Sequence, residues 1–253
     1  MKKNYIKKPE EIELIAEGGK ILGDILKRAT KLVRPGISTL ELNDFAESEI
    51  KKAGGRPSFI GYGGKKNPFP TGLCTSINDA VVHGLPSAKD ILQEGDIVGL
   101  DIGMEYKGFY TDTAVTVGVG KISALAQRLI DTTKKSMAEA IAQARPGNKI
   151  GDIGYAAQTV GEAAGFSMVR DLVGHGVGYA VHEDPAVPNY GKPGTGEELV
   201  EGMVIAIEPM VCEKKPHVFF DTDGWTIRTH DGGLAAHFEH TVVITKNGAK
   251  ILT

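Results

Sequence analysis

The sequence predicts an α+β fold made of two related halves around one shared sheet. Two observations lead to this prediction: helix ends recur at a fixed spacing, and apolar strand-like runs that carry a carboxylate recur in the same order. In each half two helices come first and two acidic strands follow. We therefore expect a single domain over 1–253, with pseudo-twofold halves at approximately 9–120 and 121–253.

The first half begins with two predicted helices. Apolar side chains recur at helical spacing from about Pro9 to Val33, and this run stops at the Arg-Pro-Gly of residues 34–36. A second helix begins with a capping-box pattern, Ser38 followed by Glu41, and ends near the Ala-Gly-Gly of residues 53–55.

The second half repeats these helix signals. Apolar residues at intervals of four run from Leu125 to Ile141, and an Arg-Pro-Gly follows at 145–147. Another helix then extends to the Ala-Gly of residues 164–165. Both the Arg-Pro-Gly pair and the Ala-Gly pair lie 111 residues apart, which favours an internal duplication over coincidence.

The strands of both halves carry carboxylates in apolar runs. A run that begins at Glu94-Gly95 reaches Asp101, and a run that begins at Glu201-Gly202 reaches Glu208 after the same seven residues. Each is followed by a second β-rich run headed by a carboxylate, Asp112 in TDTAVTV and Glu239 in FEHTVVIT. An isolated buried carboxylate costs several kcal/mol, so four of them need compensation.

Composition excludes several classes of protein. A net charge of −3 argues against a broad nucleic-acid surface, and two cysteines are too few for a disulfide framework. No window of about 20 apolar residues is present, and the basic N-terminal stretch lacks the apolar run of a signal peptide. We expect a cytoplasmic protein, monomeric by default.

Two divalent cations would neutralise four converging carboxylates. Oxygen ligands suit divalent ions, and an added imidazole shifts the preference towards transition metals. GHGVGYAVHEDP supplies His175 between two glycines and His182 seven residues later. The glycines argue against a helix, so this is not the zinc-protease pattern of two histidines one turn apart.

Two other carboxylate chemistries fit less well. An aspartic protease needs Asp-Thr-Gly or Asp-Ser-Gly, whereas Asp112 is followed by Thr113 and Ala114. A glycosidase that works with two carboxylates would leave the other two acids and the histidine between glycines unexplained.

Motifs along the whole chain resemble those of the methionine aminopeptidases of type I. The resembling stretches are CTSINDAVVHGLP (74–86), LDIG (100–103), YTDT (110–113), GHGVG (174–178), VHEDP (181–185), IEPM (207–210), DGWTIRT (223–229) and FEHTVVI (238–244). The resemblance implies the pita-bread fold and removal of the initiator methionine from nascent chains when the second residue is small. The short spacing from Glu208 to Glu239 and the early first helix fit type I, in a compact form without an N-terminal extension, as in bacteria.

The resemblance also implies a dinuclear metal site. Asp101 would bind one ion, His175 and Glu208 the other, and Asp112 and Glu239 both. The ions could be cobalt, manganese, iron, zinc or nickel, and the hydroxide between them would attack the first peptide bond. Glu208 would accept and donate the proton. Because one ion would bind the free α-amine, activity should fall at acid pH.

Substrate contacts follow from the same resemblance. His182 would stabilise the oxyanion, and His83 would contact the peptide near the scissile bond. The methionine pocket would be formed by four residues: Tyr62, Phe69, Cys74 and Trp225. His217, His230 and His237 match no catalytic position, and neither does His240, although it adjoins Glu239.

Two departures concern this pocket. About four extra residues, Lys65 to Pro68, lengthen the loop after Tyr62, and Val181 replaces a position that is often aromatic in the family. We hypothesise a wider or more mobile pocket. Strict methionine preference with an unaltered KM after deletion of 65–68 would contradict this.

Two alternatives have different activities. A proline-specific peptidase of the prolidase or aminopeptidase P type usually carries an additional N-terminal domain, for which the early first helix leaves no room. A non-catalytic binding protein on this fold typically loses metal ligands. The partner we expect is the N-terminal methionine of nascent polypeptides, with neither membrane nor specific nucleic acid. The ribosome would be a natural second partner, although no motif shows it.

Overall fold

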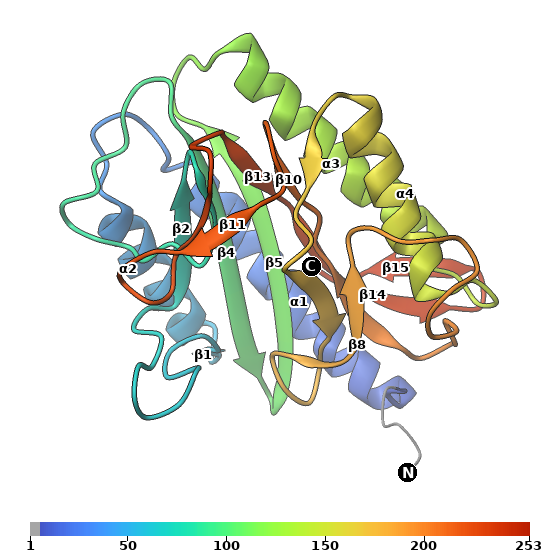
Figure 1. Cartoon of the computed structure of the whole chain (residues 1–253). Helices are drawn as coiled ribbons and strands as arrows, with labels where there is room; N and C mark the ends of the chain where they lie inside the picture. The colour runs from blue at the N-terminus through green and yellow to red at the C-terminus, as the bar shows by residue number, and fades with distance from the viewer. Residues whose placement is uncertain (1–5) are drawn as a thin grey trace.

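A computed structural model describes residues 6–253, and the basic residues 1–5 lie outside the described part. Four long helices and a curved sheet of mainly antiparallel strands make up the molecule (Figure 1). The helices are α1 (Pro9–Thr30), α2 (Thr39–Lys52), α3 (Ala124–Gln143) and α4 (Ile150–Ala163). The α+β prediction is confirmed. None of the described helices combines the length and apolar character needed to cross a bilayer.

The largest sheet has nine strands and runs through both halves of the chain. Its main path is β1 (Arg56–Pro57), β4 (Ile97–Tyr106), β5 (Phe109–Gly118), β14 (Glu239–Thr245), β9 (Val204–Ile207), β7 (Val173–Gly176) and β8 (Glu183–Pro188). Two further strands, β2 (Leu73–Ile77) and β15 (Gly248–Ile251), pair with β4 and β14. Strand β14 lies between β5 and β9 and thereby joins the strands of the two predicted halves.

Two three-stranded sheets complete the fold. One has the order β13 (Ala235–His237), β10 (Met210–Cys212), β6 (Ser167–Met168); the other has the order β11 (Val218–Phe220), β12 (Ile227–Thr229), β3 (Ala80–Val82). Strand β3 thus leads directly into His83, and Phe238 alone separates the end of β13 from Glu239.

The helices begin where their sequence signals place them. In α2 the amide of Glu41 donates to Ser38 Oγ (3.2 Å) and the amide of Ser38 donates to Glu41 Oε2 (2.9 Å), which is the predicted capping box. Helix α1 ends at Thr30, three residues before the predicted end at Val33. The amide of Val33 instead donates to the carbonyl of Thr30 (3.2 Å), in a tight turn that leads to Pro35.

Several local features recur at the predicted spacing. Gly36 and Gly147 both adopt φ 86°, and their amides donate to the carbonyls of Leu92 (2.8 Å) and Leu199 (3.3 Å) respectively. Only glycine reaches this left-handed backbone at low cost, which explains why each Arg-Pro motif is followed by it. The exact division into halves near residue 120 stays a prediction.

Each helix pair covers its own part of the sheet (Figure 1). A core containing Leu22, Leu42 and Leu100 packs α1 and α2 against β4, and a core containing Leu129, Ile153 and Ile205 packs α3 and α4 against β9. These buried apolar layers hold the central strands on rigid supports, and the opposite face of those strands is free to form a site.

Candidate metal centre

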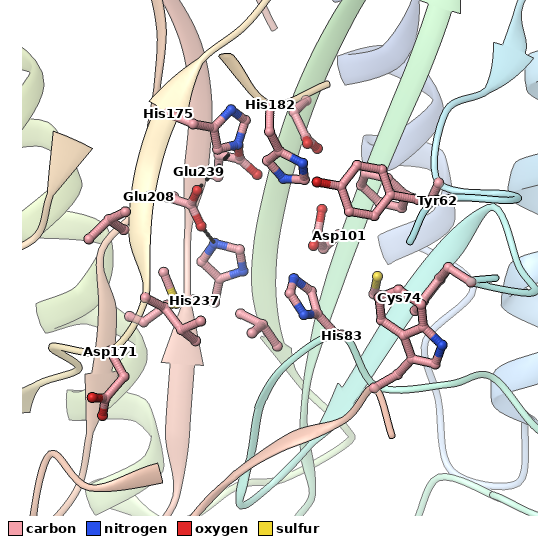
Figure 2. A pocket seen from close by; sticks show the side chains of 18 residues that line it. Tyr62, Cys74, His83, Asp101, Asp171, His175, His182, Glu208, His237 and Glu239 are labelled. Atoms are coloured by element: carbon pink, nitrogen blue, oxygen red, sulfur yellow. Dashed lines mark ion pairs between the residues drawn. The ribbon is translucent and has the colours of Figure 1, made fainter. Parts of the chain in front are cut away.

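A cavity of about 320 Å³ lies where β4, β5, β14 and β9 meet (Figure 2). Every residue proposed from the sequence for catalysis, metal binding or methionine recognition lines it: Tyr62, Phe69, Cys74, His83, Asp101, Asp112, His175, His182, Glu208, Trp225 and Glu239. The structure therefore brings together residues that are up to 177 positions apart in the chain.

Strand register explains why the carboxylates converge. Ala114 of β5 pairs with Asp101 of β4 on one side and with Glu239 of β14 on the other. Directly paired residues share a face of a sheet, and Asp112 shares that face because it lies two positions before Ala114. The small alanine between the two acids leaves space for ions.

The second half of the chain adds two candidate ligands beside Glu239. Glu208 follows β9 directly, one residue beyond the end of the strand, and His175 lies in β7. His175 Nε2 lies 3.4 Å from Glu208 Oε1 and 3.9 Å from Glu239 Oε1. Figure 2 shows these side chains pointing into the same space.

Two overlapping groups of side chains have the geometry to hold cations. Ligand atoms of Asp101, Asp112 and Glu239 lie within 4.8 Å of one another, and so do those of His175, Glu208 and Glu239. Asp112 also falls in such a group with His175 and His182. Glu239 belongs to both main groups, which is the arrangement expected of a ligand shared by two ions.

Unpartnered oxygens support the fit of a metal. Asp101 Oδ1, Asp112 Oδ1 and Glu239 Oε1 are buried and accept no hydrogen bond within the described residues. Buried polar atoms normally have a partner, because an unsatisfied one costs about 1–3 kcal/mol. Cations among these oxygens would remove that cost.

The electrostatics without a cation are unfavourable for the ionised acids. Burial raises the pKa of Asp101 to about 6. Burial and then the neighbouring carboxylates raise the pKa values of Asp112 and Glu239. Burial also opposes ionisation of Glu208, but contact with His237 and the nearby His175 outweigh it and lower the pKa of Glu208.

Two histidines face the carboxylates from opposite sides of the cavity. His83 follows β3 and adopts φ 58°, a left-handed conformation that is uncommon for a residue with a Cβ. His182 lies between β7 and β8 with its ring 4.4 Å from that of His175 and 4.9 Å from that of Tyr62. Burial lowers the pKa of both His83 and His182 to about 4, so both are neutral at neutral pH.

An apolar wall closes one side of the cavity. Phe69 and Cys74 are buried, and the ring of Phe69 meets that of Trp225 edge to face at 5.1 Å. Tyr62 is 44% exposed and therefore stands at the mouth of the cavity. Cys74 pairs directly with Asp101, and burial followed by that carboxylate raises the pKa of the thiol well above its usual value.

The extra loop residues lie outside this wall. The amide of Phe69 donates to the carbonyl of Tyr62 (2.8 Å), which closes the loop between them. Lys65 to Pro68 are all exposed and none lines the cavity. Val181 is buried in the cluster of Phe69 and Cys74. The hypothesis of a wider or more mobile pocket stays a prediction.

His237 was missed by the sequence analysis, which matched it to no catalytic position. It lines the cavity, and its Nε2 lies 3.3 Å from Glu208 Oε2. The alternation of side chains along extended chain could have identified it. His237 lies two residues before Glu239, so both side chains point to the same side. His240 directly follows Glu239, so its side chain points to the opposite face of the strand. Its Nδ1 contacts Thr253 Oγ1 (3.0 Å).

Known proteins resemble this chain over nearly its whole length. The chain is 47% identical to a methionine aminopeptidase of Clostridium acetobutylicum and 44% identical to methionine aminopeptidase 1 of Bacillus subtilis, with 98% of each protein covered in both pairs. The crystal structure of a methionine aminopeptidase from Thermotoga maritima matches with a TM-score of 0.95 at 44% identity, covering 98% of both chains.

A prolidase from Pyrococcus horikoshii matches less closely. Its TM-score is 0.77 at 26% identity, and the match covers 98% of this chain but 63% of the prolidase. The fold is thus the pita-bread fold that both kinds of peptidase share. The model of metallopeptidase family M24 matches residues 13–246. With its carboxylates and histidines gathered at the junction of β4, β5, β14 and β9, the chain belongs to metallopeptidase family M24.

Proposed function

We propose that this metallopeptidase removes the N-terminal methionine from nascent polypeptides whose second residue is small. The observation that carries the proposal is the apolar wall of Phe69, Cys74 and Trp225 immediately beside the carboxylate cluster. Relatives named methionine aminopeptidase, at 44–47% identity over nearly the whole chain, support the same substrate.

Five side chains would hold two divalent cations. Asp101 would bind one ion, His175 and Glu208 the other, and Asp112 and Glu239 would contact both. When bound, a pair of such ions polarises a carbonyl and lowers the pKa of water towards 7. Carboxylates with one imidazole accommodate manganese, iron, cobalt, zinc or nickel.

Glu208 would accept the proton that the attacking water releases. Its lowered pKa keeps the carboxylate ionised and able to accept a proton at neutral pH. Oε2 faces His237 and Oε1 faces His175, so the carboxylate is held between two imidazoles. The proton would then pass from Glu208 to the leaving amine.

His182 and His83 would orient the peptide. Both imidazoles are neutral at neutral pH, so each carries one N–H that can donate to a carbonyl oxygen. His182 would donate to the oxygen of the scissile carbonyl, where negative charge develops. His83 would contact the peptide on the other side of the cavity.

The apolar wall would select the side chain. An unbranched thioether fits a slot formed by aromatic edges and a small buried thiol, whereas a charged side chain would lose its hydration there. Tyr62 at the mouth would close over the substrate. Emerging chains would be the natural substrates, acted on in the cytoplasm by a monomer, and contact with the ribosome would fit that role.

Competing peptides test this function directly. The metal-loaded chain should cleave Met-Ala-Ser at least about 100-fold more efficiently than Ala-Pro-Ala, because the apolar slot beside the carboxylates favours a methionine side chain. Preference for Ala-Pro-Ala would identify a proline-specific peptidase. Absence of both cleavage and bound metal in the purified protein would instead identify a non-catalytic binding protein.

A further inference from the structure

The loop that carries His182 is held from a distance by a buried lysine. Lys7 is 2% exposed, although it lies only two residues before helix α1. A buried ammonium is costly unless it is paired, so the partner of Lys7 has to contribute to the stability of that region. Its partner is Glu183, the residue after His182.

The contacts of Lys7 are specific. Nζ lies 2.6 Å from Glu183 Oε2 and 4.1 Å from the centre of the Tyr179 ring. The amide of Lys7 donates to the carbonyl of Gly202 (2.8 Å), which ties the backbone to the turn that precedes β9. A Cβ placed on Gly178 would lie 2.5 Å from Lys7 Cε, so the lysine stem passes directly against the loop.

Glu183 links Lys7 to the backbone of the loop. Its second oxygen, Oε1, accepts hydrogen bonds from the amides of Tyr179 and Ala180, the latter at 2.8 Å. One carboxylate therefore holds Lys7 with one oxygen and the loop backbone with the other. Tyr179 is also tied to α1, because its hydroxyl donates to Glu11 Oε2 (2.7 Å).

His182 itself has no such anchor. Its imidazole makes ring contacts with His175 and Tyr62 but no hydrogen bond within the described residues. The residues on either side of it are held in place. Val181 is buried in the cluster of Phe69 and Cys74, and Glu183 is paired with Lys7. The position of the imidazole therefore depends on these two anchors.

We propose that Lys7 is a positioning residue that holds His182 in place for the reaction through Glu183. This rests on the proposed function, in which His182 contacts the scissile carbonyl. Removing the ammonium would free Glu183 and the loop backbone, and a displacement of about 1 Å in a catalytic contact can cost about 100-fold in rate.

A double-mutant cycle on Met-Ala-Ser cleavage tests this. We expect Lys7→Met to lower kcat about 10- to 100-fold with KM within about threefold of wild type. In a His182→Ala background the same substitution should change kcat by less than about twofold, because the group it positions is gone. An undiminished effect of Lys7→Met in that background, or no effect in the wild type, would overturn the proposal.

Lys107→Met is the matched control. Lys107, in the turn between β4 and β5, also makes an ion pair over a long sequence separation, with Nζ 2.8 Å from Glu17 Oε2 of α1, but it lies outside the cavity. It should leave kcat within about twofold of wild type. If Lys7→Met does not fold, Glu183→Gln replaces it under the same criteria, since the amide oxygen can still accept from the loop amides.

A spectroscopic readout separates this proposal from the proposed function. The imidazole signals of His182 in the NMR spectrum should shift or broaden in Lys7→Met and stay unchanged in Lys107→Met. Unchanged His182 signals in Lys7→Met would reject the role of Lys7 even if the enzyme is active. Failure of wild type to cleave Met-Ala-Ser would reject the function and leave this comparison valid.

Discussion

Ala114 shows how single residues shape the centre. It lies between Asp101 and Glu239 across three paired strands. Its methyl group is the smallest side chain that still restricts the backbone conformation of a strand residue. A larger side chain would fill the space between the carboxylates. The cluster therefore depends on one small residue as well as on the acids.

Replacing Asp112 by asparagine should separate stability from activity. The metal-loaded Asp112→Asn variant should lose at least about 1,000-fold in kcat/KM, because a shared ligand would be missing. The metal-free variant should be more stable by about 1 kcal/mol, because burial and the other carboxylates oppose ionisation of Asp112. Thermal unfolding should show this as a rise of about 2–4 °C.

Asp131→Asn serves as the control for this change. Asp131 is an exposed residue of α3 whose carboxylate accepts a hydrogen bond from Gln127, so neither activity nor metal-free stability should change appreciably. An Asp112→Asn enzyme that keeps wild-type activity would show that Asp112 is not a ligand.

Among the elements, the junction of β5 with β14 is held largely by threonine hydroxyls. Only two residue pairs, Glu239 with Ala114 and His240 with Thr113, connect these strands. Beside them, Thr241 Oγ1 accepts from the amide of Asp112 (3.0 Å) and donates to its carbonyl (2.8 Å). The hydroxyl of Thr241 thus replaces a backbone partner for Asp112, which is a proposed metal ligand.

Thr241→Val should loosen this junction. Two buried backbone groups of Asp112 would lose their partner, which should cost about 1–3 kcal/mol in the free energy of unfolding. Metal affinity should fall about tenfold or more, the usual effect of removing a group that orients a ligand. Denaturant unfolding and calorimetric metal titration measure the two effects.

The hydroxyl itself is tested by matched variants. Thr241→Ser keeps the oxygen and should behave as wild type in metal affinity. Thr245→Val, in the same strand, removes a hydroxyl that bonds within the hairpin to Gly248 and Asn247 and should leave metal affinity unchanged. Equal metal affinity in Thr241→Val and wild type would refute the role of Thr241.

Sequence patterns predicted the elements better than the contacts between them. Asp101 and Asp112 stood out because carboxylates in apolar strand runs need compensation. His237 did not stand out, because nothing in Ala-Ala-His-Phe-Glu marks the histidine as functional. Only the alternation of side chains along the chain places it on the same side as Glu239. The link from Lys7 to Glu183 spans 176 positions, and only the folded chain shows it.

In the whole molecule, the centre lies where strands from the two predicted halves meet. Asp101 and Asp112 come from the first half, and Glu208 and Glu239 come from the second. Each pair is mounted on strands that are covered by their own two helices. Binding ions at this junction would therefore link the halves and stabilise the molecule as a whole.

This linkage should depend on pH. Without metal, the raised pKa of Asp101, about 6, means that the folded chain keeps a proton that the unfolded chain releases near pH 4. Metal-free stability contributed by Asp101 therefore falls as pH rises through that window, and the raised pKa values of Asp112 and Glu239 act in the same direction. Cations would replace these protons, so stabilisation by metal should grow with pH.

Thermal unfolding with and without Mn²⁺ at pH 5.0 and pH 7.5 measures this dependence. The rise in Tm caused by Mn²⁺ should be larger at pH 7.5. The low pKa values of His83 and His182 act in the opposite direction, but they are present in both samples and largely cancel in the difference. An equal rise at both pH values would contradict the linkage.

Five side chains from the two predicted halves are proposed to hold a pair of cations. Anomalous diffraction from crystals grown with Mn²⁺ tests it most directly. We predict two peaks about 3.5–4 Å apart, with Asp112 and Glu239 in contact with both. A single peak, no peak, or ions outside the cluster of Asp101, Asp112, His175, Glu208 and Glu239 would contradict the account.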